Sequence, residues 1–157
     1  MKKVLLMSLL ASKLLAGGMF SSGYKNFGFS INSSSSYGNN YTVIGINANY
    51  FIIDNLSIGA GYRGWFGDKP SIYEVSIPIT LYAPMGGYNP YVGVVFNRTT
   101  VDKPYEDYSV YGGRMGIAMQ MGMNSFMSIG WVYEYRESES GEKISKGYPE
   151  INAGFSF

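Results

Sequence analysis

The stretch Ile72-Tyr-Glu-Val-Ser-Ile-Pro-Ile-Thr-Leu-Tyr82 decides how this chain folds. From Tyr73 to Leu81 its apolar side chains stand at every second position, so they share one face of an extended strand. Polar and small residues stand between them and share the other face. A helix would need apolar residues every three or four positions instead. Residues 72–82 are therefore predicted to form a β-strand that separates an apolar from a polar environment.

The same alternation continues on both sides of this stretch. In the last segment, for example, Phe155 and Phe157 alternate with Gly154 and Ser156. The strands predicted in this way are 24–33, 41–52, 56–65, 72–82, 91–98, 108–121, 126–136 and 148–157. Eight strands of about 10 residues with short connections fit the 135 residues that follow position 22 of the 157.

The predicted connections alternate between two kinds. Tight joins are expected at 53–55, 85–89 and 122–125, and longer polar loops at 33–40, 66–70, 99–107 and 137–146. Short turns at one end and longer loops at the other are typical of transmembrane barrels. The predicted fold is therefore all-β, an eight-stranded antiparallel up-and-down transmembrane β-barrel preceded by a signal peptide.

The first 22 residues have the pattern of a secretory signal peptide. Lys2 and Lys3 precede the apolar run Val4–Ala11, and small residues follow it. The small residues that could flank the cleavage site are Ala16, Gly17, Gly18, Ser21 and Ser22. Lys13 and the Gly17-Gly18 pair argue against a membrane anchor, which needs about 20 apolar residues. The chain is thus divided into a signal peptide, 1–22, and a barrel, 23–157.

The two faces of the strands indicate what surrounds the barrel. A soluble eight-stranded carrier would turn a charged face to water, but here the polar face is mostly Gly, Ser, Asn and Ala. Its few charges balance: Arg63, Glu74, Arg114, Glu134, Arg136 and Glu150. The apolar face carries no charge at mid-strand, as hydrocarbon requires. We therefore predict that the apolar face is outside, in lipid.

Composition excludes several functions. The chain has no Cys and no His, which removes thiolate chemistry, the commonest general base and the commonest metal ligand. A net charge of +1 does not suit nucleic-acid binding. The motif Gly59-Ala-Gly-Tyr-Arg-Gly64 matches a dinucleotide-binding loop, but it lies within a predicted strand and no helix follows. We expect no catalytic residue, no cofactor, no metal site and no nucleic-acid partner.

Aromatic residues gather at both ends of the predicted strands. Two such bands match the girdles at the two interfaces of a membrane, and a sugar-binding platform is the alternative for the band near the long loops. The band near the short turns comprises Tyr50, Tyr82, Tyr88, Tyr91 and Phe126. The band near the long loops comprises Tyr41, Tyr62, Trp65, Phe66, Tyr108, Tyr111, Tyr133, Tyr135 and Tyr148.

Three segments resemble a known family. The turn region 50–62, the stretch Asn89-Pro-Tyr-Val-Gly93 and the end Ile151-Asn-Ala-Gly-Phe-Ser-Phe157 look like parts of small OmpA/OmpX-type outer-membrane barrels of Gram-negative bacteria. The resemblance implies a monomer in the outer membrane, in contact with its lipid and lipopolysaccharide. It also implies periplasmic chaperones and a barrel-assembly machinery that reads a C-terminal signal. The residues of that signal are Ile151, Ala153, Phe155 and Phe157.

An eight-stranded barrel has room inside only for its own side chains. We therefore expect a non-enzymatic protein with a structural or surface-contact role and a plugged lumen. The alternative is a narrow channel for ions or small solutes. Some small outer-membrane barrels of this type modify lipid and use a His. This chain has no His, so a lipid-modifying enzyme is disfavoured.

The six charges of the polar face are predicted to pair across hairpins. Residues opposite one another across a turn have position numbers with a near-constant sum. This arithmetic predicts three pairs: Arg63 with Glu74, Arg114 with Glu134, and Arg136 with Glu150. Together they would form a charge network that plugs the lumen. Unpaired charges in a wet lumen are the alternative.

Overall fold

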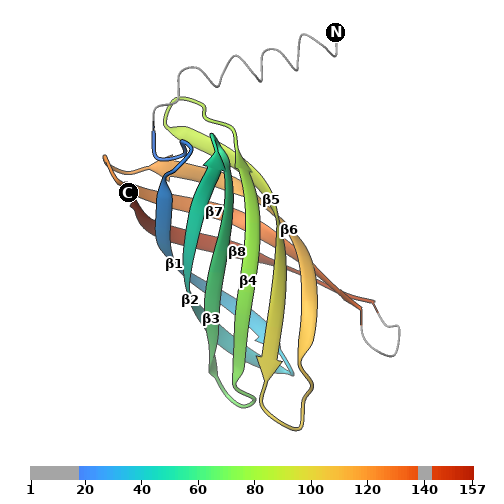
Figure 1. The fold of residues 1–157 in the computed structure, drawn as a ribbon. Coiled ribbons are helices and arrows are strands. Elements are labelled where there is room, and N and C mark those ends of the chain that lie inside the picture. The colour runs from blue at the N-terminus through green and yellow to red at the C-terminus, as the bar shows by residue number, and fades with distance from the viewer. Residues whose placement is uncertain (1–17, 138–142) are drawn as a thin grey trace.

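The computed structural model describes residues 18–137 and 143–157, which form a closed barrel of antiparallel strands (Figure 1). Each strand pairs with the next along the chain, and the last pairs with the first. The strands are β1 (Lys25–Ser36), β2 (Asn39–Ile53), β3 (Leu56–Gly67), β4 (Ile72–Tyr82), β5 (Tyr88–Val101), β6 (Tyr108–Gln120), β7 (Ser125–Glu137) and β8 (Lys143–Ser156). The predicted all-β, eight-stranded up-and-down topology is confirmed.

The barrel closes where the beginning and the end of the chain meet. β1 and β8 pair from Asn26 opposite Ser156 to Ile31 opposite Ile151. Lys25 and Phe157 exchange two backbone hydrogen bonds of 2.9 Å at the end of this seam. Closure gives every strand two neighbours, and the β1–β8 ladder covers six residues of each strand toward the terminal end.

The connections differ from the prediction. One end of the barrel holds both ends of the described chain and the connections 54–55, 83–87 and 121–124; we call it the terminal end. We call the opposite end the loop end. The loop-end connections 37–38, 68–71 and 102–107 are similarly short; residues 138–142 lie outside the described residues. The predicted contrast in length was therefore wrong.

The largest difference lies at 33–40, which was predicted to be a loop. The β1–β2 ladder continues through Ser36 opposite Asn39, and only Tyr37 and Gly38 turn the chain. Both have positive φ, 51° and 77°, as the tightest hairpin turns require. The serines of this segment pair through their backbones with the next strand, so a polar composition did not mean a loop.

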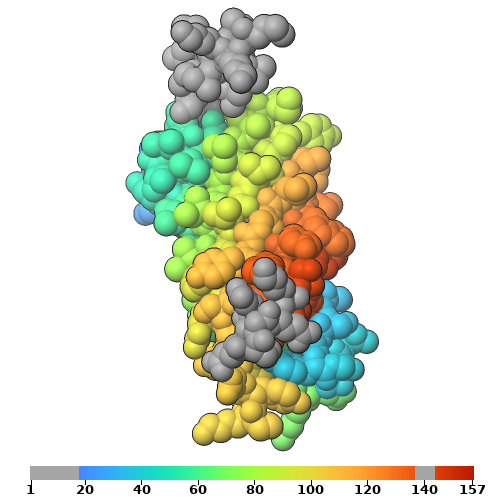
Figure 2. All heavy atoms as spheres, turned by 90° about the vertical axis from the view of Figure 1, so that its right-hand side faces the viewer, coloured from blue at the N-terminus to red at the C-terminus, as the bar shows by residue number. Residues whose placement is uncertain are grey.

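The outer surface is apolar at the middle of every strand. Large side chains remain exposed at mid-strand, among them Phe29 (52% exposed), Val94 (60%) and Trp131 (52%). Seen from the side in Figure 2, the described strands make a continuous, elongated wall. The predicted alternation is thus present, with its apolar face turned outward. The described residues include no helix long and apolar enough to span a membrane.

The interior is arranged in three layers. At the terminal end the buried side chains are apolar, with Phe51, Tyr91 and Phe126 among them. The middle layer holds Val95, Val132 and Tyr148 beside the charged residues. At the loop end lies a cluster of Tyr41, Val43, Ile72 and Val101, with Trp65 and Tyr108 packed against it.

Candidate functional site: the filled lumen

The first ion pair of the lumen joins neighbouring strands. Arg63 on β3 lies opposite Glu74 on β4, as the hairpin arithmetic predicted, and its Nη2 contacts Glu74 Oε1. Both side chains point into the barrel by strand alternation and are only 11% and 4% exposed. Paired charges at such burial hold strongly, because an isolated charge there would be very costly.

Further bonds extend this pair across the barrel. Arg63 Nη1 donates to the hydroxyl of Tyr148 at 2.9 Å, and that hydroxyl donates to Glu134 Oε1 at 2.6 Å. Asn97 Nδ2 donates to the same oxygen at 2.6 Å. The resulting network joins β3, β4, β5, β7 and β8, so it ties opposite walls together.

The second ion pair differs from the prediction. Arg114 contacts Glu150, with Nη2 and Oε1 2.5 Å apart, and not Glu134. The β6–β7 register places Arg114 opposite Val132, because the centre of this hairpin lies one residue before the predicted centre. Glu150 lies on β8, opposite Gly130 of β7, so the ion pair spans β7.

The third predicted pair, Arg136 with Glu150, does not form either. Arg136 lies opposite Ile144, since the β7–β8 ladder reaches to Glu137 and Lys143 and moves the centre of the hairpin. Its guanidinium lies over the ring of Tyr108, 4.2 Å from the centroid, which is a cation–π contact.

Tyr91 fills the space between the second ion pair and the terminal end. Its hydroxyl donates to Glu150 Oε1 at 3.4 Å, and Arg114 lies over its ring at 5.3 Å. A Cβ on Gly116 would come within 2.7 Å of this hydroxyl, and one on Gly130 would clash with it. These two glycines therefore make room for the ring. A cavity of about 50 Å³ lies at the centre of the lumen, enough for little more than a few waters.

A larger cavity lies at the loop end, with a volume of about 290 Å³. Tyr37, Trp65 and Tyr108 line its walls, and Glu74 and Glu134 lie among its lining residues. Lys146 reaches over the Trp65 ring, with Nζ 4.8 Å from the centroid. The two carboxylates belong to the network described above, so that network closes the cavity toward the centre of the barrel.

The aromatic bands were partly wrong. Seven of their members lie on the inner face: Tyr41, Trp65, Tyr82, Tyr91, Tyr108, Phe126 and Tyr148. On the strands that carry lumen charges, their positions share the parity of those charges (Trp65 with Arg63, Tyr148 with Glu150), a signal that was present in the sequence. The outward aromatic residues include Tyr50, Tyr62, Phe66, Tyr88, Tyr111, Tyr133 and Tyr135.

The C-terminal residues Ile151, Ala153, Phe155 and Phe157 all point outward along β8. Phe155 is 58% and Phe157 is 68% exposed. They thus present one apolar row beside the seam with β1. Residues that sequence reasoning missed are Tyr91, Asn97, Lys146 and the role of Tyr148, because their partners are distant in the sequence.

The described lumen holds four positive side chains, Arg63, Arg114, Arg136 and Lys146, and three carboxylates, Glu74, Glu134 and Glu150. Each lumen carboxylate is engaged by arginine, tyrosine or asparagine side chains. Among the described residues, no cluster of three or more Asp or Glu side chains could hold a metal ion. The arrangement therefore braces the barrel wall from inside.

Comparison with known proteins identifies the class of fold. No protein-family model and no curated protein matches the sequence. The N-terminal β-barrel domain of Pseudomonas aeruginosa OprF matches with a TM-score of 0.69 and 13% identity, over 87% of this chain and 98% of that one. Neisserial surface protein A matches with a TM-score of 0.60 and 20% identity, over 85% and 94%.

A third similar structure is the Yersinia pestis outer membrane protein Ail in a phospholipid bilayer nanodisc. It matches with a TM-score of 0.53 and 11% identity, over 87% of this chain and 100% of that one. The chain therefore has the fold of small outer-membrane β-barrels. The resemblance to the OmpA/OmpX type is shown at the level of fold.

Proposed function

We propose that this protein is an integral outer-membrane barrel without enzymatic activity, which supports the envelope and its surface contacts. The observation that carries the proposal is the orientation of the two strand faces, which is the reverse of that in a water-soluble protein. Apolar side chains cover the outer face at the middle of every strand, and the ion pairs Arg63–Glu74 and Arg114–Glu150 lie inside. Such an exterior suits hydrocarbon and would be an aggregation hazard in water.

The proposal includes export and assembly. The signal peptide would direct the chain across the inner membrane and be cleaved; residues 1–17 lie outside the described residues. Periplasmic chaperones and the barrel-assembly machinery would then receive the barrel, with the outward row that ends in Phe157 as the assembly signal. The mature protein would stand as a monomer among outer-membrane lipid and lipopolysaccharide.

The runner-up is a narrow channel for ions or small solutes. The filled centre favours the closed reading, because its cavity of about 50 Å³ lies among bonded side chains. A channel would require the two ion pairs and Tyr91 to move aside together. We therefore propose a plugged lumen.

The placement in lipid is tested by charges at two depths of the outer face. Val94 lies at the middle of β5 and Phe66 near the loop end of β3; both are 60% exposed. The V94R variant should lose about 2–4 kcal/mol of folding free energy in lipid vesicles, and F66R about 0–1 kcal/mol, because the cost of a charge rises with depth. Urea unfolding followed by tryptophan fluorescence measures both.

Two results would contradict the proposal. The first is an equal cost of V94R and F66R in vesicles. The second is a wild-type chain that is folded, monomeric and monodisperse without detergent or lipid.

A further inference from the structure

The segment before β1 folds back over the terminal end of the barrel. Ser21 N–H donates to Gly18 O at 2.9 Å, and Gly18 N–H donates to Ser21 Oγ at 3.1 Å, which closes a turn. The turn is tied to the β2–β3 hairpin, since Asn55 N–H donates to Phe20 O at 2.7 Å and Ser22 N–H to Asp54 Oδ1 at 2.8 Å. These hydrogen bonds hold the turn against the β2–β3 hairpin.

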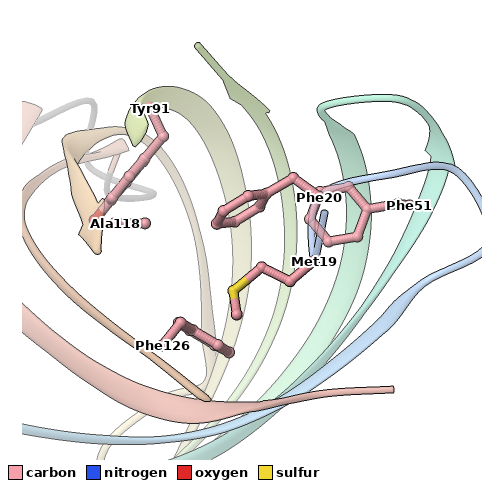
Figure 3. Close-up of a cluster of buried hydrophobic side chains, with 6 residues drawn as sticks. All are labelled: Met19, Phe20, Phe51, Tyr91, Ala118 and Phe126. Atoms are coloured by element: carbon pink, nitrogen blue, oxygen red, sulfur yellow. The ribbon is translucent and has the colours of Figure 1, made fainter. Parts of the chain in front are cut away.

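The two large side chains of this turn lie inside the barrel. Met19 is 3% and Phe20 is 6% exposed. The ring of Phe20 lies 4.6 Å from that of Tyr82 and 5.7 Å from that of Phe51. Figure 3 shows both side chains directed into the mouth, on the side of Tyr91 and Phe126.

The mouth that they fill is apolar. Phe51, Tyr91, Ala118 and Phe126 line it, and all are buried in one cluster with Met19 and Phe20. Without those two side chains the inner ring would be an apolar surface exposed to water, which is unfavourable. A signal peptide that ended at Ser22 would remove them.

We propose that Met19 and Phe20 stay in the exported protein as a plug of the terminal end, and that processing occurs within Ala16-Gly17-Gly18. This proposal rests on the export proposed above. Each of these residues is small, as the position before the cleaved bond requires, and Ala16 and Gly18 together match the A-x-A-like pattern for cleavage after Gly18. Water would hydrolyse the peptide bond after Ala16, Gly17 or Gly18, leaving a carboxylate on the leader and an amine on Gly17, Gly18 or Met19.

The processing site is tested on the wild-type chain expressed in a Gram-negative host and purified from the outer membrane. Intact mass and N-terminal sequencing should give a start at Gly17, Gly18 or Met19. A start at Phe20 or later in a folded outer-membrane barrel would overturn the plug and leave the proposed function standing. An uncleaved chain retained in the inner membrane would overturn both.

The position of the plug is tested with single cysteines, since the natural chain has none. The M19C and F20C variants are compared with M123C, which places the thiol in a turn at the same end, where Met123 is 92% exposed. Maleimide labelling of M19C and F20C should be about tenfold slower or more, because labelling then needs local opening. Equal rates for the three variants in correctly processed protein would overturn the plug.

Discussion

On the outside of the barrel the middle of every strand presents apolar side chains, whereas the inside changes from end to end. The outer row of β1 is apolar from Phe27 to Ile31 and that of β8 from Pro149 to Phe155, and toward the loop end the two rows continue with Ser33, Ser35, Ser145 and Gly147. Inside, an apolar layer with Met19 and Phe20 is followed by ion pairs, and then by a cavity of about 290 Å³ with aromatic walls.

The difference shows what each face depends on. An outer side chain needs only to be apolar, because lipid makes no specific contact. An inner side chain needs a particular partner on another strand, as Arg114 needs Glu150. Substitutions inside the barrel should therefore cost more folding free energy than similar substitutions outside. Exceptions should lie where another protein recognises the outer face.

The largest expected effect is at such an exception. Deleting Phe157 should nearly abolish the outer-membrane protein, with the chain degraded or aggregated in the periplasm, since Phe157 ends the proposed assembly signal. The control is F66A, which removes an outward aromatic ring of similar exposure at the loop end. Quantitative blots of membrane fractions measure both. Normal outer-membrane levels of the deletion variant would contradict the proposal that Phe157 is part of an assembly signal.

Next comes the contrast between two arginines. R114A leaves Glu150 buried without its partner and should cost about 3–5 kcal/mol of folding free energy. R98A removes an outer arginine that is 54% exposed and lies 3.9 Å from Asp107, and should cost about 0–1 kcal/mol. Urea unfolding in vesicles measures the two losses. Similar losses would mean that the inner pair does not brace the barrel.

A smaller effect is expected from two glycines. A Cβ on Gly130 would clash with the Tyr91 hydroxyl and lie 2.6 Å from the Met115 carbonyl oxygen. G130A should therefore cost about 1–3 kcal/mol through overpacking. G113A is the control, because the nearest atom to its added Cβ is 4.0 Å away. If both variants unfold at the same urea concentration, Tyr91 does not occupy the space assigned to it.

The two faces also differ in how far the sequence predicts them. Period two alone predicts the apolar exterior, and hairpin arithmetic places Arg63 opposite Glu74, because both depend on neighbours across one turn. The hairpin arithmetic fails for Arg114, whose partner Glu150 lies two strands away. The inward ring of Tyr91 and the docked Phe20 depend on contacts between distant segments, so local patterns could not reveal them.

The conductance of the refolded protein in a planar bilayer tests the central claim, that the barrel is closed by its own side chains. We expect no steady current through the wild-type protein. The Y91A variant should pass current, because it removes the ring that fills the lumen over Gly116 and Gly130. A steady single-channel current through the wild-type protein, as large as that of Y91A, would contradict the closed lumen and favour the narrow channel.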